Sequence, residues 1–278
     1  MENSIGQLAV VTGASSGIGL ELAKLFAEHG YDLVVVAEDS GLGAAADQLR
    51  SSGVMVESVQ ADLATQRGVE QLWERVRGLG RPVDAIAINA GVGVGGPFLE
   101  TDLAKEINMI NLNVTGAVHL SKLVVKDMAQ RGEGKILITS SIAAEMPAPF
   151  EAVYGATKAF LLSFAEALRN ELKDTRITIT ALQPGPTDTN FFHRAEMDDT
   201  KVGADKKDNP ADVARDGFEA LMAGKDHVVA GSLKNKLQSA MAQVTPETTK
   251  AEMHRKLSEP GSADRVKGTR EENRDANP

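Results

Sequence analysis

The sequence predicts an α/β protein in which about seven parallel strands form a doubly wound sheet with helices on both faces. One observation is that short apolar runs rich in Val, Ile and Leu alternate with longer stretches of helical periodicity. Continuous apolar runs are typical of parallel strands that are buried on both faces. A second observation is a glycine-rich turn that directly follows the first apolar run and opens a helix. In such a fold, ligands bind at the carboxyl ends of the strands.

The strands and helices can be assigned in order along the chain. The runs expected to form strands cover residues 8–12, 33–36, 54–59, 83–88, 135–139, 177–182 and 227–230. The first helix is expected over residues 17–29, because its apolar residues then share one face, and Gly30 is well placed to end it. The longest helix is expected over residues 102–131, where Ile and Val recur at helical spacing.

The 278 residues are expected to form one α/β domain over 1–232, a helical extension over 233–257 and a disordered tail over 258–278. In the extension, Thr245-Pro246 fits the N-cap and first position of a second short helix. The extension also carries an apolar stripe, formed by Leu233, Leu237, Met241 and Val244. This stripe could cover a neighbouring subunit, cap the active site of its own chain or lie on a membrane surface, which Lys234 and Lys236 would favour.

Composition excludes several classes of function. A net charge of −9 argues against nucleic-acid binding, which needs a basic face. The chain has no cysteine, so it forms no disulfide or zinc–thiolate site, and this fits a cytoplasmic protein. We expect no metal, because no two of the five histidines form a metal-ligand motif. The N-terminus has no signal-peptide pattern, and no apolar run reaches the ~18 residues of a membrane span.

The glycine-rich turn has the features of a phosphate-binding loop. It reads Thr12-Gly13-Ala14-Ser15-Ser16-Gly17-Ile18-Gly19 and lies between a strand and a helix. Glycines allow the backbone to approach a pyrophosphate closely, and the helix N-terminus offers free N–H groups and a partial positive charge. We therefore expect a dinucleotide there, with Gly13, Ser15, Ser16, Gly17, Ile18 and Gly19 as contacts.

Two acids follow the next strands. Glu38 lies nineteen residues after Gly19 and could accept hydrogen bonds from the adenosine ribose. Because Glu38 would repel a 2′-phosphate and the loop has no basic residue, we expect NAD as the cofactor, with NADP possible. The alternative is that Glu38 or Asp39 caps the helix that begins near Gly41. Asp62, beside Leu63, could bond the adenine amino group or serve as the N-cap of the next helix.

Tyr154 and Lys158 lie four residues apart and so share a helix face. A nearby ammonium favours the phenolate and lowers the pKa of a tyrosine. The pair could therefore form a proton-transfer group, although most such pairs are solvated helix surface.

Together these motifs resemble the short-chain dehydrogenase/reductase family in its single-domain, Rossmann-fold form. The resemblance covers roughly residues 5–232. It rests on Thr12–Gly19, Asp62, Asn89-Ala90-Gly91, Asn113, Ser141, Tyr154 with Lys158, and Pro184-Gly185. Ile88 departs from the usual asparagine before Asn89.

The resemblance implies an NAD(P)-dependent oxidoreductase that acts on an alcohol or carbonyl. It implies that Tyr154 transfers the proton, that Lys158 lowers the pKa of Tyr154 and bonds the nicotinamide ribose, and that Ser141 bonds the substrate oxygen. Asn113 would position a water that links Lys158 to solvent. Ser140 and Asn111 compete with Ser141 and Asn113. The family's spacing favours Ser141, and Asn113-Val114-Thr115-Gly116 resembles the family's Asn-x-x-Gly.

Further cofactor contacts are expected after the fourth and sixth strands. Asn89, Ala90 and Gly91 would lie near the cofactor, with Asn89 mainly tying backbone groups together. The nicotinamide end would meet Pro184, Gly185, Thr187 and Thr189, and the family bonds the carboxamide with a residue that Thr189 resembles. The alternative is an ordinary Pro/Gly turn followed by a helix-capping residue.

The substrate is expected to be a small alcohol or ketone, and a hydrophobic one if the flanking apolar residues face it. These residues are Met146, Pro149, Phe150, Phe191 and Phe192, and they could equally only pack against one another. The helices over 102–131 and 151–173 resemble those that the family pairs across subunits, so a homodimer or homotetramer is expected. Two rival functions are a non-catalytic dinucleotide sensor and an isomerase or dehydratase that uses the cofactor transiently.

Overall fold

The computed structural model describes residues 6–242 and 245–263 of the chain. A single parallel sheet lies at its centre, with strand order β3-β2-β1-β4-β5-β6-β7. The strands are β1 (Leu8–Thr12), β2 (Asp32–Ala37), β3 (Val56–Gln60), β4 (Ala85–Ile88), β5 (Glu133–Thr139), β6 (Arg176–Pro184) and β7 (His227–Ala230). The order reverses between β1 and β4, so the predicted doubly wound α/β fold is confirmed.

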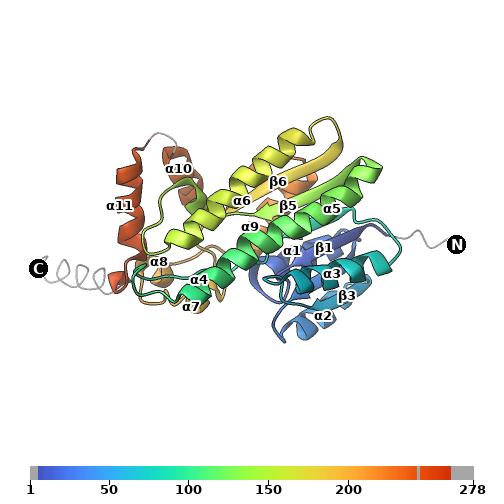
Figure 1. The fold of residues 1–278 in the computed structure, drawn as a ribbon, viewed down its shortest axis with the longest axis horizontal. Coiled ribbons are helices and arrows are strands. Elements are labelled where there is room, and N and C mark those ends of the chain that lie inside the picture. The colour runs from blue at the N-terminus through green and yellow to red at the C-terminus, as the bar shows by residue number, and fades with distance from the viewer. Residues whose placement is uncertain (1–5, 243–244, 264–278) are drawn as a thin grey trace, which may run out of the picture.

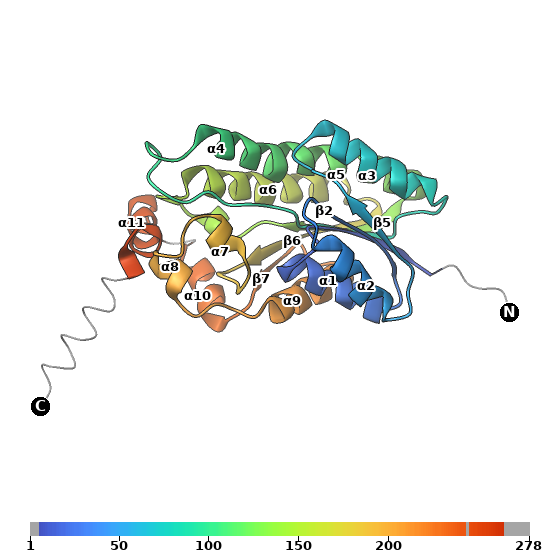
Figure 2. The same cartoon turned by 90° about the horizontal axis from the view of Figure 1, so that it is seen from below.

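Helices cover both faces of the sheet (Figure 2). One face carries α3 (Gln66–Gly78), α4 (Leu103–Ile110), α5 (Ala117–Arg131) and α6 (Ala152–Glu171). The other carries α1 (Gly17–Glu28), α2 (Leu42–Arg50) and α9 (Pro210–Met222). Each face buries its own apolar cluster, because strand side chains alternate between the two sides. Within the described residues, no helix is long and apolar enough to cross a membrane.

The predicted helix over residues 102–131 consists of three consecutive helical pieces. A π-helical segment, Asn111–Gly116, lies between α4 and α5. This π-helical segment contains Asn113, which is fully buried and hydrogen-bonds to Val92, in the segment after β4. Such π segments often occur at functional sites.

The C-terminal helices lie together at the end of the molecule opposite the N-terminus (Figure 1). They are α10 (Leu233–Ala242) and α11 (Glu247–Ser258), and the short helices α7 (Phe191–Arg194) and α8 (Lys201–Ala204) lie nearby. We call residues 189–209, which include α7 and α8, the lid.

Two details of the extension differ from expectation. Helix α11 begins at Glu247, one residue later than predicted, because Thr245 donates its hydroxyl to the Met241 carbonyl instead of capping the helix. The expected disordered tail is wrong for residues 258–263, since Ser258 and Ser262 are buried and hydrogen-bonded. Val244 of the apolar stripe and tail residues 264–278 lie outside the described residues.

Candidate active site

A cavity of about 320 Å³ opens at the carboxyl ends of the central strands. All residues predicted to contact the cofactor line it, from Gly13 in the glycine turn to Thr189 in the lid. Of the four predicted catalytic residues, Ser141, Tyr154 and Lys158 line it as well, and Asn113 lies behind the wall. Tertiary structure therefore brings together residues that are spread over most of the domain.

The glycine turn leaves no room for side chains at three positions. Gly13 has φ +67°, and a Cβ there would lie 3.0 Å from the Cα of Ala90. Gly17 has φ +57°, and its Cβ would lie 2.9 Å from the Cγ2 of Thr189. A Cβ on Gly19 would overlap the carbonyl oxygen of Gly13. The turn is thus a tight backbone cradle, and the first N–H groups of α1 have no acceptors within the helix.

Asn89 holds this cradle against the sheet. Its Nδ2 donates to the Thr12 carbonyl at 3.1 Å, and its Oδ1 accepts from the Thr139 hydroxyl at 3.1 Å. The Thr12 hydroxyl accepts in turn from the backbone N–H groups of Asn89 and Ala90. These contacts join β1, β4 and β5 below the cavity, which agrees with the expected structural role of Asn89.

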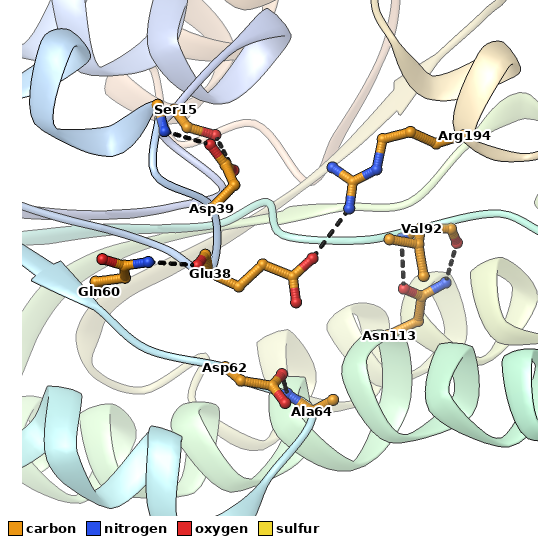
Figure 3. Close-up of polar contacts among 10 residues, drawn as sticks. Ser15, Glu38, Asp39, Gln60, Asp62, Ala64, Val92, Asn113 and Arg194 are labelled. Carbon is orange, nitrogen blue, oxygen red and sulfur yellow. Dashed lines mark hydrogen bonds and ion pairs between the residues drawn. The ribbon is translucent and has the colours of Figure 1, made fainter.

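Figure 3 shows the end of the cavity where the adenosine is expected. Glu38 does not cap α2; its Oε1 accepts from Nη2 of Arg194 in α7 at 3.0 Å. Asp39 shapes the turn instead, accepting from the backbone N–H of Gly41 at 2.9 Å and the Ser15 hydroxyl at 2.7 Å. The carboxylate of Glu38 therefore faces the cavity with a cation from the lid beside it.

Asp62 is not the N-cap of α3. Thr65 caps that helix through its hydroxyl, which accepts from the N–H of Gly68 at 3.0 Å. Asp62 accepts from the N–H of Ala64 at 2.9 Å and remains on the cavity wall (Figure 3).

Ser141, Tyr154 and Lys158 converge at the other end of the cavity. Lys158 Nζ lies 5.8 Å from the centre of the Tyr154 ring and donates to the Thr139 carbonyl at 3.0 Å. Ser140 is engaged elsewhere, because its hydroxyl donates to the Lys158 carbonyl at 2.7 Å. As a donor to the protein backbone, Ser141 makes only a long 3.5 Å contact to the Pro184 carbonyl, and it also lies within hydrogen-bond reach of Tyr154. Its hydroxyl is therefore the more available of the two.

Asn113 is committed to protein contacts. Its amide exchanges two hydrogen bonds with the backbone of Val92, at 3.0 and 2.9 Å (Figure 3). It also donates to the Thr157 hydroxyl at 3.1 Å. A Cβ on Gly91 would lie 3.2 Å from both Asn113 Oδ1 and Lys158 Nζ. The arrangement places Asn113 behind Lys158, where it holds the irregular segment that follows β4.

The family model for short chain dehydrogenases matches residues 7–200. The chain belongs to the short-chain dehydrogenase family. It is 27% identical over 256 residues to the ketoacyl reductase HetN of a Nostoc species, and the match covers 88% of each chain. A Sphingobium yanoikuyae short-chain dehydrogenase, solved with NADPH, is 32% identical with a TM-score of 0.75, covering 80% of this chain and 87% of its own. The bulky-bulky ketone specific alcohol dehydrogenase of Comamonas testosteroni is 27% identical with a TM-score of 0.72, covering 86% and 93%.

The electrostatics of this dehydrogenase site differ from the sequence-based expectation. Burial raises the pKa of Tyr154 above its ordinary value, and the negative charge of Glu151 acts in the same direction. A hydrogen bond with Ser141 opposes them. Burial lowers the pKa of Lys158 to about 8. The pKa of Tyr154 is thus raised rather than lowered here, and the effect that opposes the rise is the hydrogen bond with Ser141.

The turn after β6 meets the C-terminal extension. A Cβ on Gly185 would overlap the Asn235 side chain of α10, so the glycine is needed there for helix packing. The Thr187 hydroxyl donates to the Gly185 carbonyl at 2.9 Å. The Thr189 hydroxyl accepts from the N–H of Phe191 at 3.3 Å, whereas the N-cap of α7 is Asn190.

The extension closes the cavity of its own chain. Asn235 of α10 and His254, Leu257 and Ser258 of α11 all line the cavity. The apolar stripe is not part of this closure, because none of its described members, Leu233, Leu237 and Met241, lines the cavity. The exposed side chains of its stripe, Leu233, Leu237 and Met241, face away from the core.

The substrate end of the cavity is partly apolar. Met146, Phe191 and Phe192 line it, whereas Pro149 and Phe150 are not among its lining residues in the described part of the chain. The ring of Phe191 lies 5.2 Å from that of Tyr154. Apolar side chains thus flank the predicted reacting centre.

Sequence reasoning missed three functional candidates: Arg194, Glu151 and His254. Arg194 reaches Glu38 across 156 residues, and His254 reaches Glu151 across 103. No local pattern marks either contact. The only available signal was His254 itself, an ionisable residue in an extension with an amphipathic pattern.

Proposed function

We propose that the protein is an NAD(P)-dependent oxidoreductase that transfers a hydride between a nicotinamide cofactor and an alcohol or carbonyl substrate. The observation that carries this proposal is one cavity lined both by the glycine cradle and by Ser141, Tyr154 and Lys158. The cradle fits a pyrophosphate, because Gly13, Gly17 and Gly19 bring bare backbone to the start of α1. When bound, the cofactor supplies or accepts the hydride.

Tyr154 supplies the proton in the reducing direction. Because burial raises its pKa, the phenol keeps its proton at neutral pH and can give it to the oxygen of a carbonyl as negative charge develops there. Ser141 donates a hydrogen bond to the same oxygen and stabilises that charge. Lys158, 5.8 Å from the ring centre, adds a positive charge when protonated.

We propose NAD as the preferred cofactor, with Glu38 bonding the ribose hydroxyls. Arg194 leaves NADP possible, because its guanidinium lies beside Glu38 and could pair with a 2′-phosphate. The related enzyme from Sphingobium yanoikuyae was solved with NADPH, which supports the same possibility.

We propose a hydrophobic ketone or secondary alcohol as the substrate. Met146, Phe191, Phe192 and Leu257 give the cavity an apolar side, and the similar enzyme of Comamonas testosteroni is specific for bulky ketones. A homo-oligomer is supported by exposed apolar side chains on α4 and α6, namely Leu103, Ile107 and Phe160.

The deciding experiment is a screen of NADH and NADPH against a panel of carbonyls, and of NAD and NADP against alcohols. We expect a change in nicotinamide absorbance with at least one apolar ketone, and its loss in Tyr154→Phe. A dinucleotide sensor would bind cofactor without any turnover. An isomerase or dehydratase would convert its substrate with no net change in the redox state of the cofactor.

A further inference from the structure

A buried polar cluster joins α11 to the start of α6. The carboxylate of Glu151 accepts from the Ser258 hydroxyl at 2.8 Å and lies 3.0 Å from Nε2 of His254. Ser258 and His254 are themselves 3.2 Å apart. Glu151, His254 and Ser258 are 6%, 8% and 1% exposed. A carboxylate accepts but does not donate, so the extension holds Glu151 through two donors.

This cluster lies beside the proposed acid/base group. Glu151 is the residue before α6, and Tyr154 is in the first turn of that helix. Glu151, His254 and Ser258 line the same cavity as Tyr154. The negative charge of Glu151 is one of the causes, after burial, that raise the pKa of Tyr154. A change in the charge of Glu151 should therefore change the pKa of Tyr154.

Other charged groups in this region occupy different positions. Lys158 of α6 lies 5.8 Å from the centre of the Tyr154 ring, and Asp205, Lys206 and Asp208 line the cavity from the lid. Arg255 of α11 lies 5.2 Å from the centre of the Phe150 ring. The side chains that hydrogen-bond to the Glu151 carboxylate within the described part of the chain both belong to α11.

Two of the three members of the cluster lie beyond the residues that the family model matches. The family model ends at residue 200, whereas His254 and Ser258 belong to the extension. A buried carboxylate is costly unless donors compensate it. The donors that compensate the buried Glu151 carboxylate thus come from the C-terminal extension.

We propose that His254 and Ser258 are positioning residues of the active site, which hold the Glu151 carboxylate beside Tyr154 and so couple the C-terminal extension to proton transfer. This inference rests on the proposed role of Tyr154. It assigns α11 a part in the reaction beyond closing the cavity.

Substitutions of Glu151 and of its donor His254 should shift the pKa of Tyr154 in opposite directions. Glu151→Gln keeps an acceptor for Ser258 but removes the negative charge, so the pKa of Tyr154 should fall. His254→Leu removes a donor and leaves the carboxylate charge less compensated, so the pKa of Tyr154 should rise. Ser258→Ala should act as His254→Leu does, but less strongly. Each shift should be on the order of one pH unit or less.

The first measurement needs no activity. The chain has two tyrosines, so Tyr154 is the only one left in a Tyr31→Phe background. In that background, the tyrosinate absorbance should appear at lower pH with Glu151→Gln than without it, while circular dichroism shows that both remain folded. An unchanged or later onset would overturn the inference.

The second measurement is the pH profile of alcohol oxidation, with a substrate whose turnover Tyr154→Phe abolishes. Its alkaline rise should move to lower pH in Glu151→Gln and to higher pH in His254→Leu. Ser262→Ala is the matched control, because Ser262 is buried in the same extension but contacts the N–H of Lys201. It should leave the profile unchanged.

The outcomes separate the two proposals. If Tyr154→Phe keeps its turnover, the proposed function fails. If Tyr154→Phe is inactive but Glu151→Gln and His254→Leu leave the profile in place, the function stands and the inference fails. A profile that Ser262→Ala moves equally would also overturn the inference, because it would then reflect packing of the extension alone.

Discussion

Glu38 and Arg194 form an ion pair across the cofactor groove. The carboxylate at the end of β2 and the guanidinium of α7 are 3.0 Å apart, and both side chains are about half exposed, at 48% and 50%. Exposed pairs of this kind contribute little to stability and exchange partners readily. The pair therefore bears on cofactor recognition more than on folding.

Removal of the cation should sharpen the choice of cofactor. In Arg194→Ala the charge of Glu38 is no longer offset and should repel a 2′-phosphate, so KM for NADPH should rise several-fold more than KM for NADH. Lys105→Ala is a suitable control, because Lys105 pairs with Glu196 of the same lid on the surface. Equal changes in both KM values would contradict a role for Arg194 near the phosphate.

Reversal of the charge at Glu38 should change the preference. Glu38→Arg removes the acceptor proposed for the ribose hydroxyls and adds a donor for a 2′-phosphate. The ratio of kcat/KM for NADPH to that for NADH should rise by about tenfold or more, equivalent to about 1.4 kcal/mol. If the ratio does not move, Glu38 does not contact the ribose.

Tyr154→Phe should separate chemistry from binding. Loss of the hydroxyl should lower kcat by about 10²-fold or more, the range for a positioned acid or base. Cofactor affinity, measured by fluorescence or calorimetry, should stay near its original value. Lys158→Ala should reduce both kcat and cofactor affinity, since Lys158 lines the cavity and also donates to the Thr139 carbonyl.

The two directions of the reaction should depend on pH in opposite ways. Oxidation needs the phenolate of Tyr154, whose pKa is raised, so its rate should climb through the alkaline range. Reduction needs the phenol and a protonated Lys158, whose pKa is about 8, so reductive kcat/KM should fall as pH rises through about 8. A reductive profile that is flat across this pH would rule out a required charge on Lys158.

Two glycines should respond differently to alanine. Gly19→Ala places a methyl group against the Gly13 carbonyl and should weaken both folding and cofactor binding. Gly43→Ala, in α2, meets nothing within 4 Å and should stabilise the fold by about 0.5–1 kcal/mol. Thermal unfolding of both variants tests this contrast, which would fail if they shift the midpoint in the same direction.

Much of the fold could be predicted from local patterns. The seven apolar runs correspond to β1–β7, with ends shifted by a few residues, because pairing with neighbours extends or shortens a strand. The residues that cap the start of a helix are harder to predict, because a candidate side chain can hydrogen-bond elsewhere instead. Asp62 looks like an N-cap, yet Thr65 caps α3, and Thr245 bonds back to Met241.

The sequence by itself determined the strand runs, the glycine turn and the Tyr154–Lys158 pair, because each depends on short-range spacing within one strand, turn or helix; Ser141 came from the resemblance to the family's spacing. Only the tertiary structure decided that Arg194 faces Glu38, that α11 holds Glu151, and that Tyr154 is less acidic rather than more. These depend on burial and on contacts between segments more than a hundred residues apart, and neither leaves a periodic trace in the sequence.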